Sequence, residues 1–217
     1  MNLYIYGSGG NGCELCDIAE RINSQKKRWE NIFFVDDIRI ERTWYDRKVY
    51  RFDEMLANRH EYECIISLGE PAYRKELHDK LTHNNVSLAT LIDPSANISP
   101  SASIGSGSII GSGSFVSSNT TIDTNVMLEV STFVGHDIHI GMHTVICSSS
   151  VIGGNTHIGS ESFIGLNCSI KEKTTIGDFC IIGMGSCVVK DIDSGYIALG
   201  NPARPIRKNE QYRVFKS

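Results

Sequence analysis

The chain has 217 residues, 41% of them hydrophobic and 21% charged, with a formal net charge of −4 at pH 7. A weakly acidic chain of this length suits one or two domains and gives no electrostatic case for nucleic acid or an anionic membrane surface as a partner. No apolar run approaches the length of a membrane span, and Met1 leads into a strand-like segment instead of a signal peptide. We therefore expect a cytoplasmic protein whose seven cysteines are free thiols.

Residues 1–93 read as an α/β domain of the Rossmann-like kind. We expect strands at 2–6, 32–37, 63–68 and 86–92, and helices at 13–22, 53–59 and 71–84. The glycine-rich loop Gly7–Gly12 separates the first strand from the first helix, so its N–H groups lie at a helix N-terminus and suit an anion. The domain is short for a complete dinucleotide site. We expect one nucleotide, with its pyrophosphate near Gly9 and Gly10 and its ribose or base near Asp36 and Asp37.

Residues 94–217 are dominated by a period of six. An aliphatic residue stands at every sixth position: Ile98, Ile104, Ile110, Val116, Ile122, Leu128, Val134, Ile140, Ile146, Ile152, Ile158, Ile164, Ile170, Ile176, Ile182 and Val188. Neither a helix nor a flat strand generates this period. Three steps make a triangular coil of eighteen residues with one inward aliphatic side chain on each side. Stacked coils bury a continuous core that no single repeat buries alone.

The positions beside each aliphatic residue support tight corners. The residue two positions earlier is usually small, as at Ser108 and Thr144. The residue that follows is often glycine, as at Gly105 and Gly153, and we expect it to relieve strained turn conformations.

This [LIV]-G-x-x-[ST]-x pattern resembles the hexapeptide-repeat acyltransferases, whose fold is a left-handed parallel β-helix. Together with the small Rossmann-like domain, it is similar to the sugar acetyltransferases of the sialic acid O-acetyltransferase type. Relatives in that group N-acetylate nucleotide-linked amino sugars such as perosamine and the bacillosamine precursor. The resemblance is carried by Gly7–Gly12, Phe34–Asp37, Gly69 with Arg74, the pair His136-Asp137, and the ending Gly200–Pro205.

The resemblance implies a role for each matched residue. His136 is expected to be the general base, for which an imidazole pKa near 6.5 is suited, and Asp137 is expected to orient its ring. Acetyl-CoA is the implied cosubstrate, without a metal; the matched contacts are Gly154, Gly183 and Met184. The nucleotide sugar is the implied acceptor; its expected contacts are Gly9, Gly10, Asn11, Asp36, Asp37, Gly69, Arg74 and Glu129.

Three positions depart from the family pattern. Asn11 stands where several relatives have a histidine facing the substrate, Glu129 where asparagine is frequent, and Val145 where some members have histidine. Lys190 and Arg204 or Arg207 near the C-terminus are candidates for binding the CoA phosphates, with a solvated face as the alternative for each.

The remaining histidines and cysteines give weaker signals. His139 and His157 are eighteen residues apart and should lie side by side on neighbouring coils. A two-histidine metal site is an alternative there, but no carboxylate occupies the intervening positions. His143 is expected to face outward without a partner. Cys147 is the alternative nucleophile, although nothing beside it in the sequence would lower its pKa.

The sequence leaves three functions open. The first is an N-acetyltransferase acting on a nucleotide-linked 4-amino-4,6-dideoxyhexose for surface polysaccharide or glycan synthesis. The second is a sugar O-acetyltransferase, and the third is a non-catalytic nucleotide-sugar-binding scaffold. A homotrimer is expected, because outward apolar residues form rows on two faces of the coils. One row is Ile109, Met127, Val145, Phe163 and Ile181, and the next is Phe115, Phe133 and Val151 before it turns polar.

Overall fold

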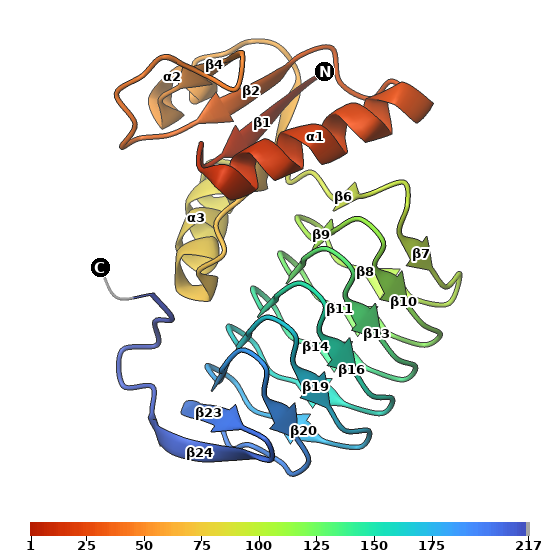
Figure 1. The fold of residues 1–217 in the computed structure, drawn as a ribbon. Helices are drawn as coiled ribbons and strands as arrows, with labels where there is room; N and C mark the ends of the chain where they lie inside the picture. The colour runs from red at the N-terminus through yellow and green to blue at the C-terminus, as the bar shows by residue number, and fades with distance from the viewer. Residues whose placement is uncertain (216–217) are drawn as a thin grey trace.

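The computed structural model describes residues 1–215 and contains two parts (Figure 1). The N-terminal part is a five-stranded sheet of order β3-β4-β2-β1-β5. Its elements are β1 (Asn2–Tyr6), α1 (Gly10–Gln25), β2 (Ile32–Val35), β3 (Thr43–Trp44), β4 (Arg47–Tyr50), α2 (Phe52–Leu56), β5 (Tyr62–Ile66) and α3 (Pro71–His83). All pairings are parallel except that of β3 with β4. The hairpin formed by β3 and β4 was not expected from the sequence.

Side chains of β1 alternate between two apolar layers, as the period of a strand requires. Leu3 and Ile5 pack with α1 on one face of the sheet, whereas Tyr4 and Tyr6 pack on the other face with residues of α2 and α3. Helices therefore cover both faces of a mostly parallel sheet. This is the Rossmann-like arrangement that the sequence predicts.

The C-terminal part is a β-helix of two-residue strands. β6 (Leu91–Ile92), β9 (Ile109–Ile110), β12 (Met127–Leu128), β15 (Val145–Ile146), β18 (Phe163–Ile164), β21 (Ile181–Ile182), β23 (Tyr196–Gly200) and β24 (Ala203–Lys208) form the first sheet. The second contains β7 (Asn97–Ile98), β10 (Phe115–Val116), β13 (Phe133–Val134), β16 (Val151–Ile152), β19 (Ser169–Ile170) and β22 (Cys187–Val188). The third contains β8 (Ser103–Ile104), β11 (Thr121–Ile122), β14 (His139–Ile140), β17 (His157–Ile158) and β20 (Thr175–Ile176).

The predicted eighteen-residue coil is confirmed by the strand register. Val116 lies beside Val134, and Val134 beside Ile152, so the inward aliphatic residues stack in line. Most of them are completely buried in one core cluster. We name the three faces after one residue each: the Ile109 face, the Phe133 face and the His139 face.

The glycines that follow the aliphatic residues are required by close stacking of the coils and not, as expected, by a strained turn conformation. A Cβ on Gly105 would lie 2.5 Å from the backbone of the next coil at Thr124, so close stacking excludes a side chain there. The strained conformation falls two residues later in most of the turns. Asn119 and Asp137, for example, have φ values of 56° and 55°, a region that asparagine and aspartate tolerate better than most residues.

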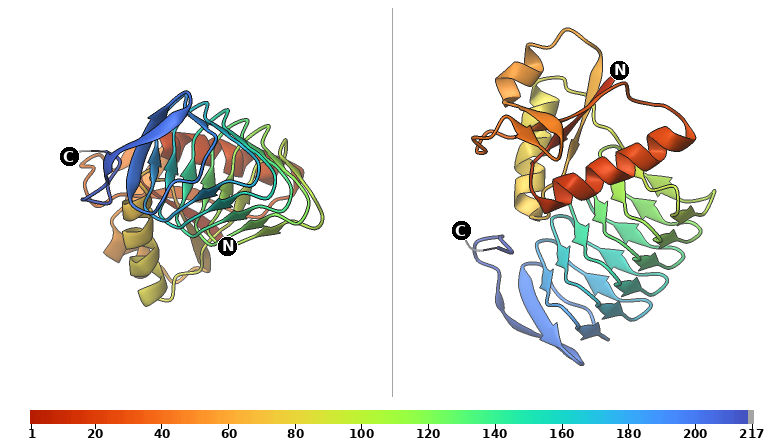
Figure 2. Two further views of the ribbon diagram at one scale, coloured as in Figure 1. Left: turned by 90° about the horizontal axis from the view of Figure 1, so that it is seen from below. Right: turned by 45° about the horizontal axis from the view of Figure 1, so that its top comes forward.

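The N-terminal part packs on the Ile109 face, and this corrects the sequence interpretation of that row. Ile109, Met127 and Val145 are at most 2% exposed, because α1 and the sheet cover them. The further views show α1 lying along the upper coils, with the whole N-terminal part on one side of the prism (Figure 2). The row therefore forms a contact within one chain and is not available as the interface between three chains.

The division of the chain at residues 93 and 94 remains a prediction, but β6 already belongs to the β-helix. Leu91 and Ile92 pair with Ile109 and Ile110. The expected strand at 86–92 is therefore wrong as an N-terminal element; only Leu88 forms a bridge with Cys64 of that sheet. None of the described helices is both long and apolar enough to cross a membrane.

Candidate active site

The β-helix has three columns of turns, and each candidate residue belongs to one of them. The His136 corner joins the Phe133 and His139 faces and contains residues 117–120, 135–138, 153–156, 171–174 and 189–191. The Glu129 corner contains 111–114, 129–132, 147–150, 165–168 and 183–186. The Asn125 corner contains 105–108, 123–126, 141–144, 159–162, 177–180 and 193–195. The His136 corner is the vertex opposite the Ile109 face, so the N-terminal part of the same chain is far from it.

His136 and Asp137 form a hydrogen-bonded pair on an exposed turn. The ring Nδ1 lies 2.7 Å from Asp137 Oδ2, and Asn119 of the preceding coil donates to Asp137 Oδ1 at 3.2 Å. The bond from His136, followed by that from Asn119, lowers the pKa of Asp137. An ionised carboxylate only accepts hydrogen bonds, so Nδ1 carries the proton and Nε2 keeps its lone pair. This is the tautomer that a general base needs.

Gly154 supports the imidazole ring from the next coil. A Cβ on Gly154 would lie 2.7 Å from Nε2 of His136 and 2.8 Å from Cε1. Any side chain here would push the ring away from its position. Within residues 1–215 the N–H of Gly154 donates to no protein acceptor, so it is available to an anionic oxygen.

Exposed lysines continue the His136 corner toward the C-terminal end. Positions 136, 154, 172 and 190 follow at intervals of eighteen, which places Lys190 in the same column as His136. Lys171 and Lys173 flank the intermediate turn, and all three lysines are exposed. The corner thus combines one imidazole, one free amide and three exposed cations along a single edge, with the exposed acids Glu172 and Asp191 among them.

Gly183 and Met184 lie on a different edge. They belong to the Glu129 corner, where Met184 is 75% exposed. Glu129 accepts hydrogen bonds at 3.0 Å from both the backbone N–H and the hydroxyl of Ser148. It also borders a cleft of about 220 Å³ between α1 and the coils, opposite Glu14. One ligand therefore cannot bridge Gly154 and Gly183 of the same prism without crossing the Phe133 face.

The glycine loop leaves open space at the N-terminus of α1. Nothing lies within 4 Å of where a Cβ would be on Gly9 or Gly10, and both residues are exposed. Gly69 approaches the loop from the end of β5, with its Cβ position 3.3 Å from the Asn11 side-chain nitrogen. Helix N–H groups face this space and suit a phosphate.

The carboxylates of Asp36 and Asp37 mainly accept hydrogen bonds from other groups of the protein. Asp36 accepts bonds from the N–H and hydroxyl of Ser8 and from two N–H groups of the following turn. Asp37 accepts bonds from the Tyr6 hydroxyl at 2.5 Å and the Lys80 ammonium at 2.9 Å. Burial raises the pKa of each carboxyl, but these hydrogen bonds outweigh it and lower both pKa values. The acids thus order the loop as ionised groups, a role the sequence did not indicate.

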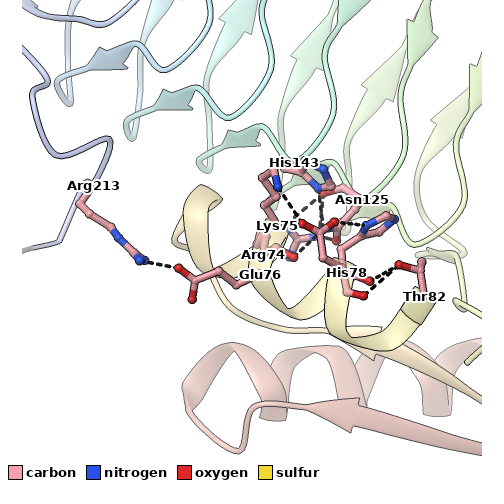
Figure 3. Close-up of polar contacts among 9 residues, drawn as sticks. Arg74, Lys75, Glu76, His78, Thr82, Asn125, His143 and Arg213 are labelled. Atoms are coloured by element: carbon pink, nitrogen blue, oxygen red, sulfur yellow. Dashed lines mark hydrogen bonds and ion pairs between the residues drawn. The ribbon is translucent and has the colours of Figure 1, made fainter. Parts of the chain in front are cut away.

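The structure corrects the role that the sequence indicates for Arg74. The sequence places it in the substrate site, but its side chain is fully buried between α3 and the Asn125 corner (Figure 3). The guanidinium donates to the carbonyl and side-chain oxygens of Asn125, and to the carbonyls of Ile66 and Leu68. These bonds use all five donors of an arginine. Arg74 therefore joins the two parts of the chain and has no donor left for a substrate.

His143 and Cys147 also differ from the sequence expectation. His143 is only 5% exposed, and its Nδ1 lies 2.9 Å from the Asn125 side-chain nitrogen. Cys147 is 6% exposed; burial, followed by the nearby Glu129, raises the pKa of its thiol. A thiol that resists ionisation is a poor nucleophile, which removes the covalent alternative.

His139 and His157 lie side by side as expected, with ring centroids 5.0 Å apart. The structure adds a carboxylate that the sequence did not indicate, since Asp123 Oδ2 lies 3.0 Å from Nε2 of His139. Even so, residues 1–215 contain no group of three or more metal-ligating side chains placed to hold a metal ion.

Comparisons with known proteins fit this architecture. The PglD N-terminal domain family matches residues 2–81. The acetyltransferase domain of PglB from Neisseria gonorrhoeae, solved with acetyl coenzyme A, has a TM-score of 0.88 and 28% identity over 94% of this chain and 98% of that one. WeeI from Acinetobacter baumannii has a TM-score of 0.89 and 25% identity over 95% and 100%. The chain is an acyltransferase, similar to the hexapeptide-repeat sugar acetyltransferases.

A third solved structure confirms the fold of this acyltransferase. A histidine mutant of perosamine N-acetyltransferase from Caulobacter crescentus, in complex with CoA and GDP-perosamine, has a TM-score of 0.89 and 24% identity over 96% of this chain and 98% of that one. The fold class is thus a Rossmann-like domain followed by a left-handed parallel β-helix, as predicted. A search of curated protein sequences gives no match.

Within one chain of the acyltransferase, the candidate residues lie in two separate groups. His136, Asp137, Gly154 and Lys190 lie on the His136 corner, whereas the glycine loop, Gly69 and Glu129 lie near the opposite face. Asn119 was missed, although its position eighteen residues before Asp137 could have revealed it. The contact of Asn125 with Arg74 had no signal in the sequence, because nothing there indicates how the two parts pack.

Proposed function

We propose that the chain is an acetyl-CoA-dependent N-acetyltransferase acting on a nucleotide-linked 4-amino-4,6-dideoxyhexose, in the synthesis of a surface polysaccharide or glycan. The observation that carries the proposal is the His136-Asp137 pair on an exposed turn, with Gly154 beneath the ring. Support also comes from the match to the PglB acetyltransferase domain over nearly its whole length.

The chemistry needs one base and one oxyanion donor. The neutral amine of the sugar attacks the thioester carbonyl, and Nε2 of His136 takes the proton that the amine loses as the C–N bond forms. The N–H of Gly154, which donates to no protein acceptor within residues 1–215, would stabilise the tetrahedral oxyanion. Collapse breaks the C–S bond, and the proton passes from Nε2 to the departing CoA thiolate. Asp137 holds the ring in the required tautomer and stabilises the imidazolium.

We further propose that acetyl-CoA lies along the His136 corner, with its phosphates toward the C-terminal lysines. The exposed cations Lys171, Lys173 and Lys190 support this orientation. The nucleotide diphosphate would lie at Gly9, Gly10 and Asn11, where N–H groups face open space. Gly69 lies beside Asn11, and Glu129 borders the cleft between α1 and the coils; both are the proposed contacts for the acceptor.

A complete site then requires a second copy of the chain. The base and the glycine loop lie on opposite sides of one prism, so the His136 corner of one copy would face the Glu129 corner of the next. Gly183 and Met184 would contact the same acetyl-CoA from that neighbouring prism. The Phe133 face lies between these corners and carries exposed apolar side chains: Phe133 is 43% and Val151 is 45% exposed. We propose that three such faces meet in a homotrimer.

The test is a thiol-release assay with acetyl-CoA and a panel of UDP-, dTDP- and GDP-linked 4-amino sugars. We expect turnover with one nucleotide class, and mass spectrometry should show an amide product. Release that depends on a sugar hydroxyl instead would assign O-acetylation. If no acceptor released CoA while nucleotide sugars still bound, the chain would be the non-catalytic scaffold.

A further inference from the structure

The geometry points to Glu70 as a positioning residue for the acceptor, acting through the C-terminal segment Asn209–Phe215. Glu70 holds this segment beside Gly69 and the glycine loop, so that the segment forms a wall of the nucleotide-sugar site. The inference rests on the function proposed above and extends it to the C-terminal segment.

The segment is anchored first at the end of the β-helix. Asn209 is 6% exposed; its backbone N–H donates to Gly195 at 2.7 Å, and its side chain donates to the carbonyl of Phe179 at 3.1 Å. The ring of Tyr212 packs against that of Phe179. These contacts fix the point at which the chain leaves the last coil.

The segment then crosses to the N-terminal part. Arg213 pairs with Glu76 of α3 at 2.6 Å, as the close-up shows, and its guanidinium lies 4.0 Å from the ring centre of Tyr73 (Figure 3). In the ribbon view the segment rises from β24 toward the beginning of α3 (Figure 1). It therefore bridges the two parts of the chain below the N-terminal sheet.

Glu70 makes the contact closest to the proposed site. It occupies the N-cap position of α3, where a carboxylate normally bonds the helix's own N–H groups, but it makes no such cap. It is 4% exposed, and its carboxylate accepts the N–H groups of Val214 at 3.0 Å and Phe215 at 2.9 Å. A buried carboxylate must be hydrogen-bonded, so losing the segment would leave it unsatisfied.

The position of this anchor suggests its role. Glu70 directly follows Gly69, whose Cβ position is 3.3 Å from the Asn11 side chain. On the other side, the ring of Phe215 meets that of Phe163 on the Ile109 face, with centroids 5.7 Å apart. The end of the segment thus fills the angle between the coils and the loops proposed to hold the nucleotide sugar. The His136 corner, where we place acetyl-CoA, lies on the opposite edge.

The experiment compares Glu70→Ala, Glu70→Gln and a chain ending at Gln211 with the wild type. Releasing the segment should raise KM for the nucleotide sugar at least fivefold and leave KM for acetyl-CoA within twofold. Glu70→Gln keeps one carbonyl acceptor and should recover part of the loss. Lys208→Ala is the matched control, because Lys208 lies on β24 over the ring of Tyr196, away from α3. Hydrogen exchange of residues 209–215 reports whether the segment has detached.

Two results would overturn the inference while leaving the proposed function intact. One is a detached segment with an unchanged KM for the nucleotide sugar; the other is an equal rise in both KM values. If the wild type acetylates no nucleotide sugar, the proposed function fails. In that case, calorimetry with UDP, dTDP and GDP tests whether Glu70 affects nucleotide binding. Equal affinities of the wild type and Glu70→Ala, or no binding by either, would overturn the inference as well.

Discussion

Arg74 and Asn125 hold the two parts of the chain together by reciprocal hydrogen bonds. The Arg74 guanidinium donates to the Asn125 side-chain oxygen at 2.6 Å, and the Asn125 side-chain nitrogen donates to the Arg74 carbonyl at 3.0 Å. Both residues are fully buried. This contact sets the height of the glycine loop along the prism, and hence which coil it faces.

Replacing Arg74 should destabilise the whole chain. Arg74→Ala leaves buried carbonyls of Ile66, Leu68 and Asn125 without donors, and each unsatisfied group costs about 1–3 kcal/mol. We expect the free energy of unfolding in urea to fall by roughly 3 kcal/mol or more. Lys75→Ala is the control, because its ion pair with Asp79 is solvent-exposed and should contribute under about 1 kcal/mol. Equal effects of the two variants would contradict this assignment.

His136 should determine kcat. As the general base it contributes to the transition state, so His136→Ala should lower kcat by about 10²–10⁴-fold with little change in either KM. Asp137→Asn should cost less, since it disturbs the ring without removing it. Raising the pH should partly restore His136→Ala for an amine acceptor, whose ammonium form must first lose a proton. Steady-state kinetics between pH 6 and pH 9 test this, and full activity of His136→Ala would exclude the role.

Gly154 should matter through the imidazole ring. A methyl group there would lie 2.7 Å from Nε2, so Gly154→Ala should displace the ring and lower kcat at least tenfold. The clash disappears when the ring is absent. Gly154→Ala added to His136→Ala should therefore reduce kcat much less than it does alone. An additive double-mutant cycle would show that the methyl acts elsewhere, for example on the oxyanion.

The buried His143 should make stability depend on pH. Burial, with smaller contributions from His78 and Arg74, lowers its pKa to about 4. Between that value and the ordinary 6.5 the unfolded chain binds more protons, so stability is lost as pH falls from about 6.5 to about 4. From pH 7 to pH 5 this site should contribute a loss of about 2 kcal/mol. Urea unfolding of His143→Asn should show a correspondingly smaller decrease; an unchanged decrease would place the titrating group elsewhere.

A charge on the Phe133 face should dissociate the proposed trimer. The rings of Phe115 and Phe133 are stacked with centroids 5.0 Å apart, and Phe133 remains 43% exposed. Phe133→Glu should give a monomer in light scattering and lose activity, because each site would need two copies. Thr121→Glu places the same charge on the His139 face and should leave the trimer intact. A wild type that is monomeric at micromolar concentration would refute the assembly.

The β-helix, its register and the proposed catalytic pair could all be predicted from local sequence patterns. The period of six is a local property, because each aliphatic residue packs against its own neighbours eighteen residues away. A chemical pair such as His136-Asp137 is likewise visible, since adjacent residues on a tight turn must lie close together. The Rossmann-like unit followed in the same way from the order of strand, glycine loop and helix.

Which apolar row is covered, and which polar residues are free to act, depends on how the two parts of the chain pack together. The rows beginning at Ile109 and Phe115 look alike in the sequence, but only the first is buried, because α1 packs there. Arg74 and His143 became interior residues because α3 packs on the Asn125 corner, and Glu70 gained the C-terminal segment as its partner. Such contacts join residues from 51 to 145 positions apart. They depend on how two completed folding units meet, which no local pattern specifies.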